Sequence, residues 1–387
     1  MKEGWTIGKF SDFFDLQMGK TPSRDNPSYW GGANIWVSIA DMNCGKYLYD
    51  TKEYITDSAV SESGIHRVKK DTVIMSFKLS IGKTAIATKD LYTNEAIMSF
   101  NTKEGYQLVP DFIYYYLKGY KWQGMNKAVM GMTLNKKAIS NNYFSFPSIL
   151  EQQHIVEELD MLSSIMEKKN AQVNELDNLA QSLFFDMFGD PITNEKRWET
   201  RKLEDVCDVR DGTHDSPKYV TESDYVLITS KNIQDGDINF KNANYITKED
   251  YDKINVRSCV DNGDIIMAMI GTIGKPIIVN KGGRKFGIKN VALLKFHKSH
   301  DVINTFIKAV LDNATYMNYI HSLNRGGTQK FVSLKTIRSL PIFLPPLDLQ
   351  NQFASKIEAI EHQKVLLKKS IKEVETLLNS RMDYWFN

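Results

Sequence analysis

The two halves of the 387-residue chain repeat one another, and this duplication limits the possible folds more than any other feature of the sequence. The pattern Trp-x3-Lys-x2-Asp at residues 5–12 returns at residues 198–205, an offset of 193. An Ile-Gly-Lys sequence at residues 81–83 returns at residues 273–275, an offset of 192. Because the motifs persist while the offset drifts, the chain is a duplicated unit with insertions in its loops.

Two further matches lie near the start and the end of each repeat. Gly19 returns as Gly212 after the opening motif. An apolar-Pro dipeptide precedes a glutamine near the end of each repeat, at Gln152 and at Gln350. The repeats therefore correspond over their whole length.

Each repeat opens with about 150 residues in which short β-branched runs alternate with loops rich in Gly, Pro, Asn and Asp. The runs predict strands and the longer apolar-periodic segments predict short helices. Predicted strands are residues 34–39, 72–77, 225–229 and 264–270, and predicted helices are residues 111–118 and 302–312. We expect α/β (α+β) globular domains in tandem, at residues 1–150 and 189–348.

Each repeat closes with an apolar heptad pattern, which predicts long helices at residues 151–188 and 349–387. The first pattern runs from Ile155 to Met187, a length of about 50 Å as a helix. A coiled coil is favoured over two helices that each pack on their own domain, because globular helices seldom keep a seven-residue period for so long. The predicted interface residues are Leu159, Leu162, Met166, Val173, Leu176, Ile357, Ile360, Leu367, Ile371 and Val374.

Chain order favours an antiparallel arrangement of the two helices, because the first helix leads from one domain to the other. Two equivalent repeats on such a pair would be related by a pseudo-twofold axis. Lys169, Lys364 and Arg381 interrupt the apolar stripe. We expect these residues to set the register or to extend towards solvent; contact with a partner subunit is the alternative.

The charge is unevenly distributed, although the whole chain carries a formal net charge of only +2. Residues 1–150 carry +4 and residues 189–348 carry +3, whereas the helix at 151–188 carries −6. The second part of each domain is more basic, with +5 at residues 73–147 and +10 at residues 265–345. This asymmetry indicates a surface that faces phosphates. A solvated face balanced by neighbouring acidic residues is the alternative.

Three polar, glycine-containing loops with basic residues and aromatic neighbours lie in these stretches, at residues 121–127, 281–287 and 324–330. Such loops suit DNA, because Arg and Lys pair with phosphate or guanine and Asn or Gln pair with adenine. The loops differ between the repeats, so we expect two different half-sites. The candidate DNA-binding residues are Lys20, Arg24, Lys83, Lys121, Lys127, Lys136, Lys218, Lys275, Arg284, Lys289, Arg325 and Lys330.

Motifs for catalysis or metal binding are missing from the sequence. Gly82-Lys83 lacks the earlier glycine of a phosphate-binding loop, so nucleotide binding is rejected. Residues 26–29, Asn-Pro-Ser-Tyr, approach the tetrad of adenine methyltransferases, but no methyl-donor loop accompanies them and we predict a turn. The seven histidines show no metal-ligand spacing. We expect no catalytic residue, no metal and no cofactor bound by this chain.

Composition places the chain among globular proteins, with 42% hydrophobic and 25% charged residues. Its three cysteines are far apart, which suits a reducing compartment. The N-terminus lacks the apolar core of a signal peptide, and the longest apolar stretch, residues 265–270, is too short to span a bilayer. A cytoplasmic protein without membrane contact is expected.

Four motifs together carry a resemblance to a known family. They are the Trp-x3-Lys-Leu-x-Asp-Val opening, the repeated Ile-Gly-Lys, the Phe-Leu-Pro-Pro-Leu-x2-Gln run at residues 343–350 with a fainter copy at 146–152, and Phe-Gly-Asp-Pro at 188–191. With them, the whole chain resembles the DNA-specificity (S) subunit of type I restriction-modification enzymes. The resemblance does not transfer individual base-contacting residues, because the recognition domains of this family vary too much.

The resemblance implies two target recognition domains, each recognising one half of an asymmetric bipartite site on double-stranded DNA, and a coiled coil that fixes the gap between the halves. It also implies two modification subunits, which bind S-adenosylmethionine and methylate adenine, and restriction subunits that use ATP and Mg. The S subunit itself is not an enzyme. Other readings are a stand-alone bivalent DNA-binding protein, a methyltransferase-only targeting subunit, or a scaffold for acidic protein partners.

Overall fold

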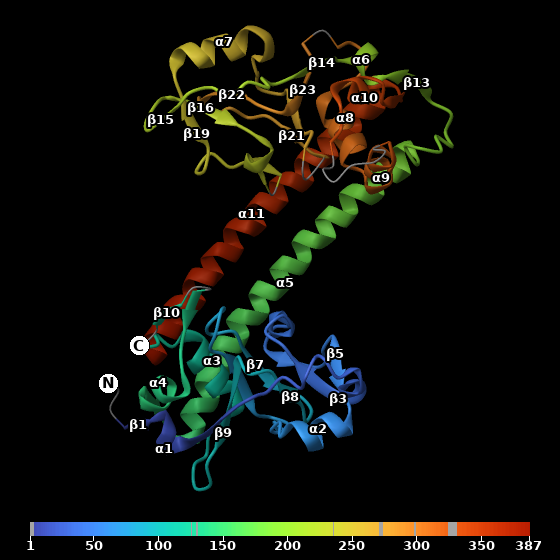
Figure 1. Cartoon of the computed structure of the whole chain (residues 1–387). Coiled ribbons are helices and arrows are strands. Elements are labelled where there is room, and N and C mark those ends of the chain that lie inside the picture. Colours follow the sequence, from blue (N-terminus) through green and yellow to red (C-terminus); the bar gives the residue numbers. More distant parts are fainter. Residues whose placement is uncertain are drawn as a thin grey trace. The chain divides into compact units, whose positions relative to one another are not determined.

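The computed structural model describes the chain except for residues 1–3, 125, 129–130, 235, 271–273, 298 and 324–330, and it describes only the backbone of residues 126–128 and 131–132. It divides into two compact units (Figure 1). Unit 1 is Met1–Ala171 with Lys368–Asn387, and unit 2 is Gln172–Leu367. Tandem duplicated domains of mixed α/β structure are thus present, as the repeats predict.

Unit 1 is built on a five-stranded sheet in the order β2-β9-β6-β7-β4, antiparallel except for the pair β4 and β7. Its strands are β2 (Phe14–Met18), β9 (Ile97–Thr102), β6 (Val73–Ser76), β7 (Thr84–Ala87) and β4 (Tyr47–Leu48). A smaller sheet contains β5 (Glu53–Ile55), β3 (Trp30–Val37) and β8 (Tyr92–Thr93), and two ribbons pair β1 (Thr6–Lys9) with β12 (Tyr143–Phe146) and β10 (Asn126–Ala128) with β11 (Gly131–Thr133). Its short helices are α1 (Phe10–Phe13), α2 (Asp57–Ser63), α3 (Pro110–Gly119) and α4 (Lys136–Asn141). Every residue of β6 and β7 is buried, which explains their continuous apolar sequence.

Unit 2 contains a four-stranded antiparallel sheet in the order β14-β23-β20-β21. Its strands are β14 (Asp208–Asp211), β23 (Val291–Lys295), β20 (Ile265–Ala268) and β21 (Gly274–Ile278). A second sheet contains β15 (Tyr219–Val220), β19 (Asn244–Ile246), β16 (Tyr225–Ile228) and β22 (Lys285–Ile288), and two ribbons pair β13 (Glu199–Lys202) with β24 (Pro341–Leu344) and β17 (Ile233–Gln234) with β18 (Asp237–Ile238). The short helices are α6 (Leu203–Val206), α7 (Lys248–Ser258), α8 (Asn304–Asp312), α9 (Ala314–Ser322) and α10 (Leu334–Arg338).

The two units share one topology, since β2-β9-β6-β7 in unit 1 corresponds to β14-β23-β20-β21 in unit 2. Helix α3 packs on β6 and β7, and α8 packs on β21 (Figure 1). The repeated Trp-x3-Lys-x2-Asp motif has a local cause, because its aspartate caps a short helix. Asp12 accepts the Lys9 N–H at 2.7 Å, and Asp205 accepts the Lys202 N–H at 3.2 Å.

Aromatic rings fill the core of unit 1. The Phe144 ring centroid lies 5.2 Å from that of Phe10, 5.0 Å from Phe14 and 4.5 Å from Tyr116. Phe386, near the C-terminus, lies 5.2 Å from Tyr116. The last turn of the chain is thereby part of the first core, because rings at such separations attract one another and bury large apolar areas.

Two helices are much longer than the others, α5 (Ile149–Phe188) and α11 (Leu347–Phe386). They begin two residues before the starts expected at 151 and 349. Each contributes one part to unit 1 and the other part to unit 2. Of the predicted interface residues, Leu159 and Ile360 are buried, and the others are half-buried: Leu162, Met166, Val173, Leu176, Ile357, Leu367, Ile371 and Val374.

A charged cluster attaches α5 to the first domain. The Lys46 ammonium lies 2.6 Å from carboxylate oxygens of both Asp111 and Asp160, and the Tyr115 hydroxyl donates to Asp160 at 2.6 Å. Burial would raise the pKa of Asp111, but hydrogen bonds from Lys46 and Tyr47 hold it below its usual value. The ionised form of Asp111 is therefore favoured, and its ion pair with Lys46 helps to hold the first domain on α5.

Candidate nucleic-acid interface

The same glycine loop occurs in both units and follows directly after equivalent strands, β2 and β14. A Cβ atom on Gly19 would lie 2.1 Å from the Thr93 carbonyl oxygen, and one on Gly212 would lie 2.3 Å from the Ile288 carbonyl oxygen. The N–H of the following residue donates to that same carbonyl, at 2.8 Å in unit 1 and 2.9 Å in unit 2. Only glycine permits so close an approach, so each unit presents the next few side chains from a fixed backbone.

In unit 1 the glycine loop carries a stacked arginine. The Arg24 guanidinium lies 3.7 Å from the centroid of the Trp30 ring and 5.0 Å from that of Trp36. It also forms a bidentate ion pair with Glu53, with 2.9 Å between Nη2 and Oε2, which lowers the pKa of Glu53. Because its side chain is still 52% exposed, Arg24 is a preoriented cation at the surface.

The same loop is fastened by Thr21, whose hydroxyl donates to Glu95. This hydrogen bond lowers the pKa of Glu95, with further contributions from the charges of Lys78 and Arg24. Lys20 is exposed next to it. Two cations, Lys78 and Arg24, thus act on the carboxylate that holds the loop.

In unit 2 the equivalent loop carries a histidine. His214 Nε2 donates to Asp211 Oδ2 at 2.8 Å, and its Nδ1 lies 3.0 Å from Asn290 Oδ1. Asp211 is 4% exposed and also accepts from Arg257. The Lys289 ammonium donates to Ser216 at 2.6 Å. Both repeats therefore fasten the loop by side-chain hydrogen bonds, to Glu95 in the turn before β9 in unit 1 and to Asp211 at the end of β14 in unit 2.

A cavity of about 400 Å³ lies beside this second loop. Its walls are the loop itself and helix α7. The lining residues are Thr213, His214, Asp215, Ser216, Pro217, Asp250, Lys253, Ile254, Arg257 and Ser258. Hydroxyl groups and charged groups of both signs line the cavity, so it suits a polar group of a ligand better than an apolar molecule.

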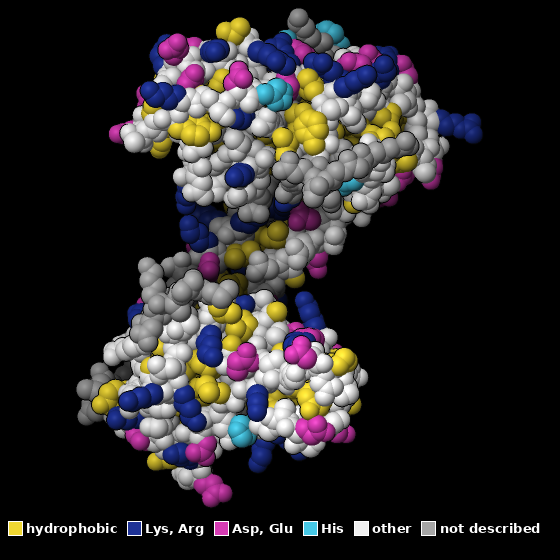
Figure 2. All heavy atoms as spheres, in the orientation of Figure 1, with side chains coloured by type: hydrophobic (Ala, Val, Ile, Leu, Met, Phe, Trp, Pro, Cys, Tyr) yellow, Lys and Arg dark blue, Asp and Glu magenta, His cyan; other side chains and the backbone are white. Residues whose placement is uncertain are grey.

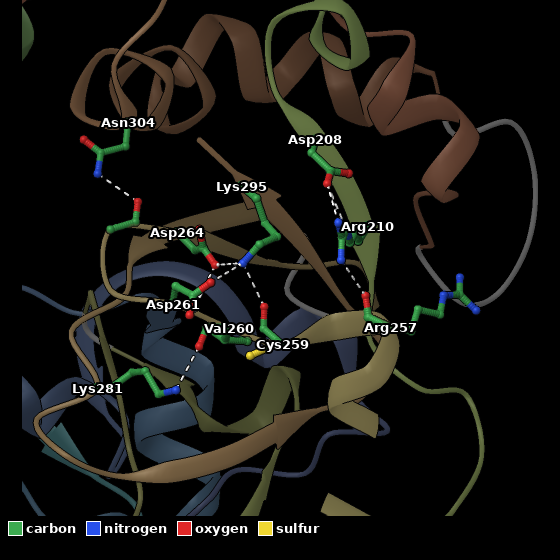
Figure 3. Close-up of polar contacts among 11 residues, drawn as sticks. Asp208, Arg210, Arg257, Cys259, Val260, Asp261, Asp264, Lys281, Lys295 and Asn304 are labelled. Carbon is green, nitrogen blue, oxygen red and sulfur yellow. Dashed lines mark hydrogen bonds and ion pairs between the residues drawn. The ribbon is translucent and has the colours of Figure 1, made fainter. Parts of the chain in front are cut away.

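A buried ion-pair cluster fixes the end of α7 and hence one wall of the cavity (Figure 3). The Lys295 ammonium is 6% exposed and uses all three protons, on Cys259 O at 2.8 Å, Asp261 at 2.8 Å and Asp264 at 2.7 Å. Burial alone would lower the pKa of Lys295, but the two carboxylates raise it above its usual value. Arg210, paired with Asp208, donates to the Arg257 carbonyl at 3.0 Å.

The structure places four of the predicted DNA-binding residues on or beside the glycine loops, namely Lys20 and Arg24 in unit 1 and Lys218 and Lys289 in unit 2. Five others lie elsewhere in their units. In unit 1, Lys136 is the first residue of α4, Lys83 is half-buried before β7, and Lys121 forms an ion pair with Asp383 of α11 at 2.9 Å. In unit 2, Lys275 follows Gly274 and has a left-handed φ of 53°. The Arg284 guanidinium lies 4.2 Å from the Phe240 ring centroid. The Lys127 side chain, Arg325 and Lys330 lie outside the described residues. On the face drawn in Figure 2, basic side chains of each unit are interspersed with acidic ones.

Sequence reasoning missed His214, Asp211, Ser216 and Thr21, because it weighed charge and not position. The usable signal was the repeated glycine, at Gly19 and Gly212, followed by polar residues. Asn26 accepts the Ser28 N–H at 3.2 Å and starts a single turn of helix, so residues 26–29 form the predicted turn. The described part of the chain contains no cluster of potential metal ligands, and none of its helices is long and apolar enough to cross a membrane.

Residues 2–175 and 195–376 both match the family model for the type I restriction modification DNA specificity domain. The chain therefore belongs to this family. This membership confirms the identification made from the repeated motifs, and with it the expectation of a non-catalytic specificity subunit.

Two curated relatives illustrate the similarity. The type I restriction enzyme MjaIX specificity subunit of Methanocaldococcus jannaschii is 24% identical over 386 residues, covering 92% of this chain and 86% of the relative. The EcoBI specificity subunit of Escherichia coli is 26% identical over 176 residues, covering 43% of this chain and 37% of the relative.

Two solved structures have a similar fold. The S subunit of the type I restriction-modification system from M. genitalium superposes with a TM-score of 0.53 at 12% identity, covering 98% of this chain and 95% of that chain. A chain from a study of complex assembly and conformational transition of the type I R-M system gives 0.60 at 15% identity, covering 100% and 98%.

Proposed function

We propose that this chain is the DNA-recognition subunit of a type I restriction-modification complex, and that each domain, residues 1–150 and 189–348, recognises one half of an asymmetric bipartite site. The observation that carries the proposal is the pair of equivalent glycine loops. They share a backbone position, at Gly19 and Gly212, but present different side chains. A backbone position that is shared by the two domains, with different side chains in each, suits two half-sites of different sequence.

We propose further that α5 and α11 form an antiparallel coiled coil, with pseudo-twofold symmetry, that sets the gap between the half-sites. Contacts within the units support this. In unit 1, Glu158 pairs with Arg381 and accepts the Trp385 indole N–H at 3.0 Å. In unit 2, Asp177 lies 2.7 Å from the Lys364 ammonium. Residues further along α5 thus meet residues earlier along α11, close to the register that places Ile155 opposite Trp385.

The charged interruptions of the apolar stripe fit this role. Lys364 pairs with Asp177 of α5, and Arg381 pairs with Glu158 of α5. Burial would lower the pKa of Lys364, but its hydrogen bonds to Asp177 and Glu361 raise that pKa above its usual value. Shifting either helix by one heptad would separate these pairs. Polar groups at such positions fix register in coiled coils, and we assign them that function here.

The proposed partners are two modification subunits, which would hold S-adenosylmethionine, and restriction subunits, which would use ATP and Mg. Exposed apolar residues on the two helices offer contact area for such subunits. They are Leu150, Met161 and Leu179 on α5, and Val365, Leu366 and Leu377 on α11. The complex would act on DNA in the cytoplasm.

Reconstitution tests the proposal. The purified chain should neither methylate nor cleave DNA, and with a modification subunit it should direct adenine methylation to one bipartite sequence, read from a methylation map of a host genome. Exchanging residues 1–147 for the equivalent part of another family member should change one half-sequence and leave the other half and the gap unaltered. Changes in both halves, or methylation by the contaminant-free chain alone, would contradict it.

A further inference from the structure

The loop between β6 and β7 holds an exposed leucine in a conformation that leucine rarely adopts. Leu79 has a φ of 64°, and the Ser80 N–H donates to the Lys78 carbonyl at 2.7 Å, which makes a γ-turn with positive φ at its centre. This region of backbone space is sterically unfavourable for bulky side chains. Leu79 is nevertheless 57% exposed, so burial within the chain does not offset the strain.

The turn is held rigidly by a buried serine. Ser76 is 0% exposed. Its hydroxyl donates to the Ser80 carbonyl and accepts the Lys83 N–H at 3.2 Å, and its carbonyl accepts the Gly82 N–H at 2.9 Å. Both sides of the turn are thereby fixed, so the leucine cannot relax by moving the loop.

Two lysines flank this leucine in the sequence, Lys78 and Lys83. Lys78 precedes it, and Lys83 ends the same loop. The charge of Lys78 contributes to the lowered pKa of Glu95, the carboxylate that also binds Thr21. Leu79 therefore lies in a loop with two lysines, of which Lys83 is a candidate DNA-binding residue.

The second repeat carries a glycine at the same place. Gly271 matches Leu79 in the sequence at the offset of 192 and lies outside the described residues. Isolated bridges join Lys78 to Thr133 and Ile270 to Phe331 at equivalent positions. Glycine adopts positive φ without steric cost. Unit 1 thus has a strained, solvent-exposed leucine at a position where the sequence of the second repeat has glycine.

We propose that Leu79 is an apolar wedge that enters the base stack of the first half-site when unit 1 binds DNA. The inference rests on the proposed function and adds a mode of base contact that only one of the two domains has. Apolar side chains that insert between base steps unstack and kink the duplex. A rigid tip loses little conformational freedom on binding, and lysines on both sides hold the adjacent phosphates.

Replacing Leu79 with glycine removes the wedge and relieves the strain together, so the variant should unfold at the same temperature as the wild type or higher. With the modification subunit present, it should bind a labelled duplex carrying the mapped site at least about tenfold more weakly, which corresponds to the burial of one leucine. A set of duplexes with 2-aminopurine at successive positions of the first half-site reports unstacking. Binding of the wild-type complex should raise the 2-aminopurine fluorescence at one base step, and binding of the Leu79→Gly complex should not.

Two controls separate the wedge from other effects. Leu79→Met keeps a long apolar side chain and should retain the fluorescence rise. Tyr143→Thr removes another exposed apolar side chain of unit 1, 62% exposed on β12, and should leave binding and fluorescence unchanged.

Each remaining outcome overturns the inference. Equal affinity and fluorescence for Leu79→Gly and wild type would mean that the leucine does not touch the bases. Weaker binding without unstacking at any step would mean that it packs on the outside of a groove. Weaker assembly with the modification subunit, at unchanged fluorescence, would assign it to a protein contact. If the wild-type complex itself shows no salt-dependent binding to the mapped duplex, the proposed function fails as well.

Discussion

Gln152 and Gln350 are fully buried, 198 residues apart in the sequence, and make the same three hydrogen bonds in the two units. Each amide oxygen accepts the N–H of the residue before a short helix, Val109 at 2.9 Å or Ile303 at 3.1 Å. Each amide nitrogen donates to the proline carbonyl five residues earlier and to one further carbonyl. The repeated Pro-x4-Gln motif is thus a clamp between the start of a long helix and the domain before it.

Breaking this clamp should destabilise its unit. Gln152→Ala removes three hydrogen bonds to the backbone, one of them fully buried. We therefore expect a loss of about 2–4 kcal/mol in the free energy of unfolding, measured by urea denaturation. The neighbouring Gln153 is exposed, and Gln153→Ala should change stability by no more than about 0.5 kcal/mol. Equal effects of the two variants would show that the buried bonds contribute nothing particular.

The buried lysine of unit 2 gives a second prediction. Lys295→Met removes the partner of Asp264, which is itself 5% exposed, and leaving a buried carboxylate unpaired should cost about 3–5 kcal/mol. Lys308 forms only a surface pair with Asp312, so Lys308→Met should cost less than about 1 kcal/mol. Thermal unfolding compares them, and a well-folded Lys295→Met chain of wild-type stability would contradict the assigned role.

Acid should weaken the same region in a defined pH window. Hydrogen bonds from Lys295 lower the pKa of Asp261, and those from Arg210 lower the pKa of Asp208. A lowered pKa in the folded state contributes stability that is present above the ordinary aspartate value and is lost as pH falls through the folded value. The unfolding temperature should therefore decrease as the pH is lowered below about 4. The decrease should be less steep for the Asp261→Asn variant. An identical acid profile for the variant would exclude this linkage.

The length of the two long helices offers a test of the proposed spacer. Inserting one heptad after Lys169 and another after Ser370 keeps the apolar seam and lengthens each helix by about 10 Å, close to three base pairs. Both half-sequences in the methylation map should stay the same, while the gap grows by about two to four base pairs. DNA twist will rotate one half-site relative to the other, so some affinity should be lost. A map with the original gap would mean that the helices do not set the spacing.

The sequence alone determined the features that depend on period and repetition. Matching motifs revealed the duplication, heptads located the long helices to within two residues of α5 and α11, and both led to the family. Strands were located where apolar runs were continuous, since the predicted 72–77 contains β6. Such signals are local, because a helix or a buried strand records its own environment in its own residues.

Tertiary structure decided which residues meet. The Gly19 N–H donates to the carbonyl of Ile97 on β9, and the glycine lies against the carbonyl of Thr93 on β8. No local pattern states either contact. Charge counting placed Lys121 among the candidate DNA-binding residues, and only the fold shows that its ammonium lies 2.9 Å from Asp383. Leu79 looked like any loop leucine until its φ was known. Hydrogen bonds and ion pairs between distant segments depend on distances that only the packed chain creates, and so the details of the interface could not be derived from composition or spacing.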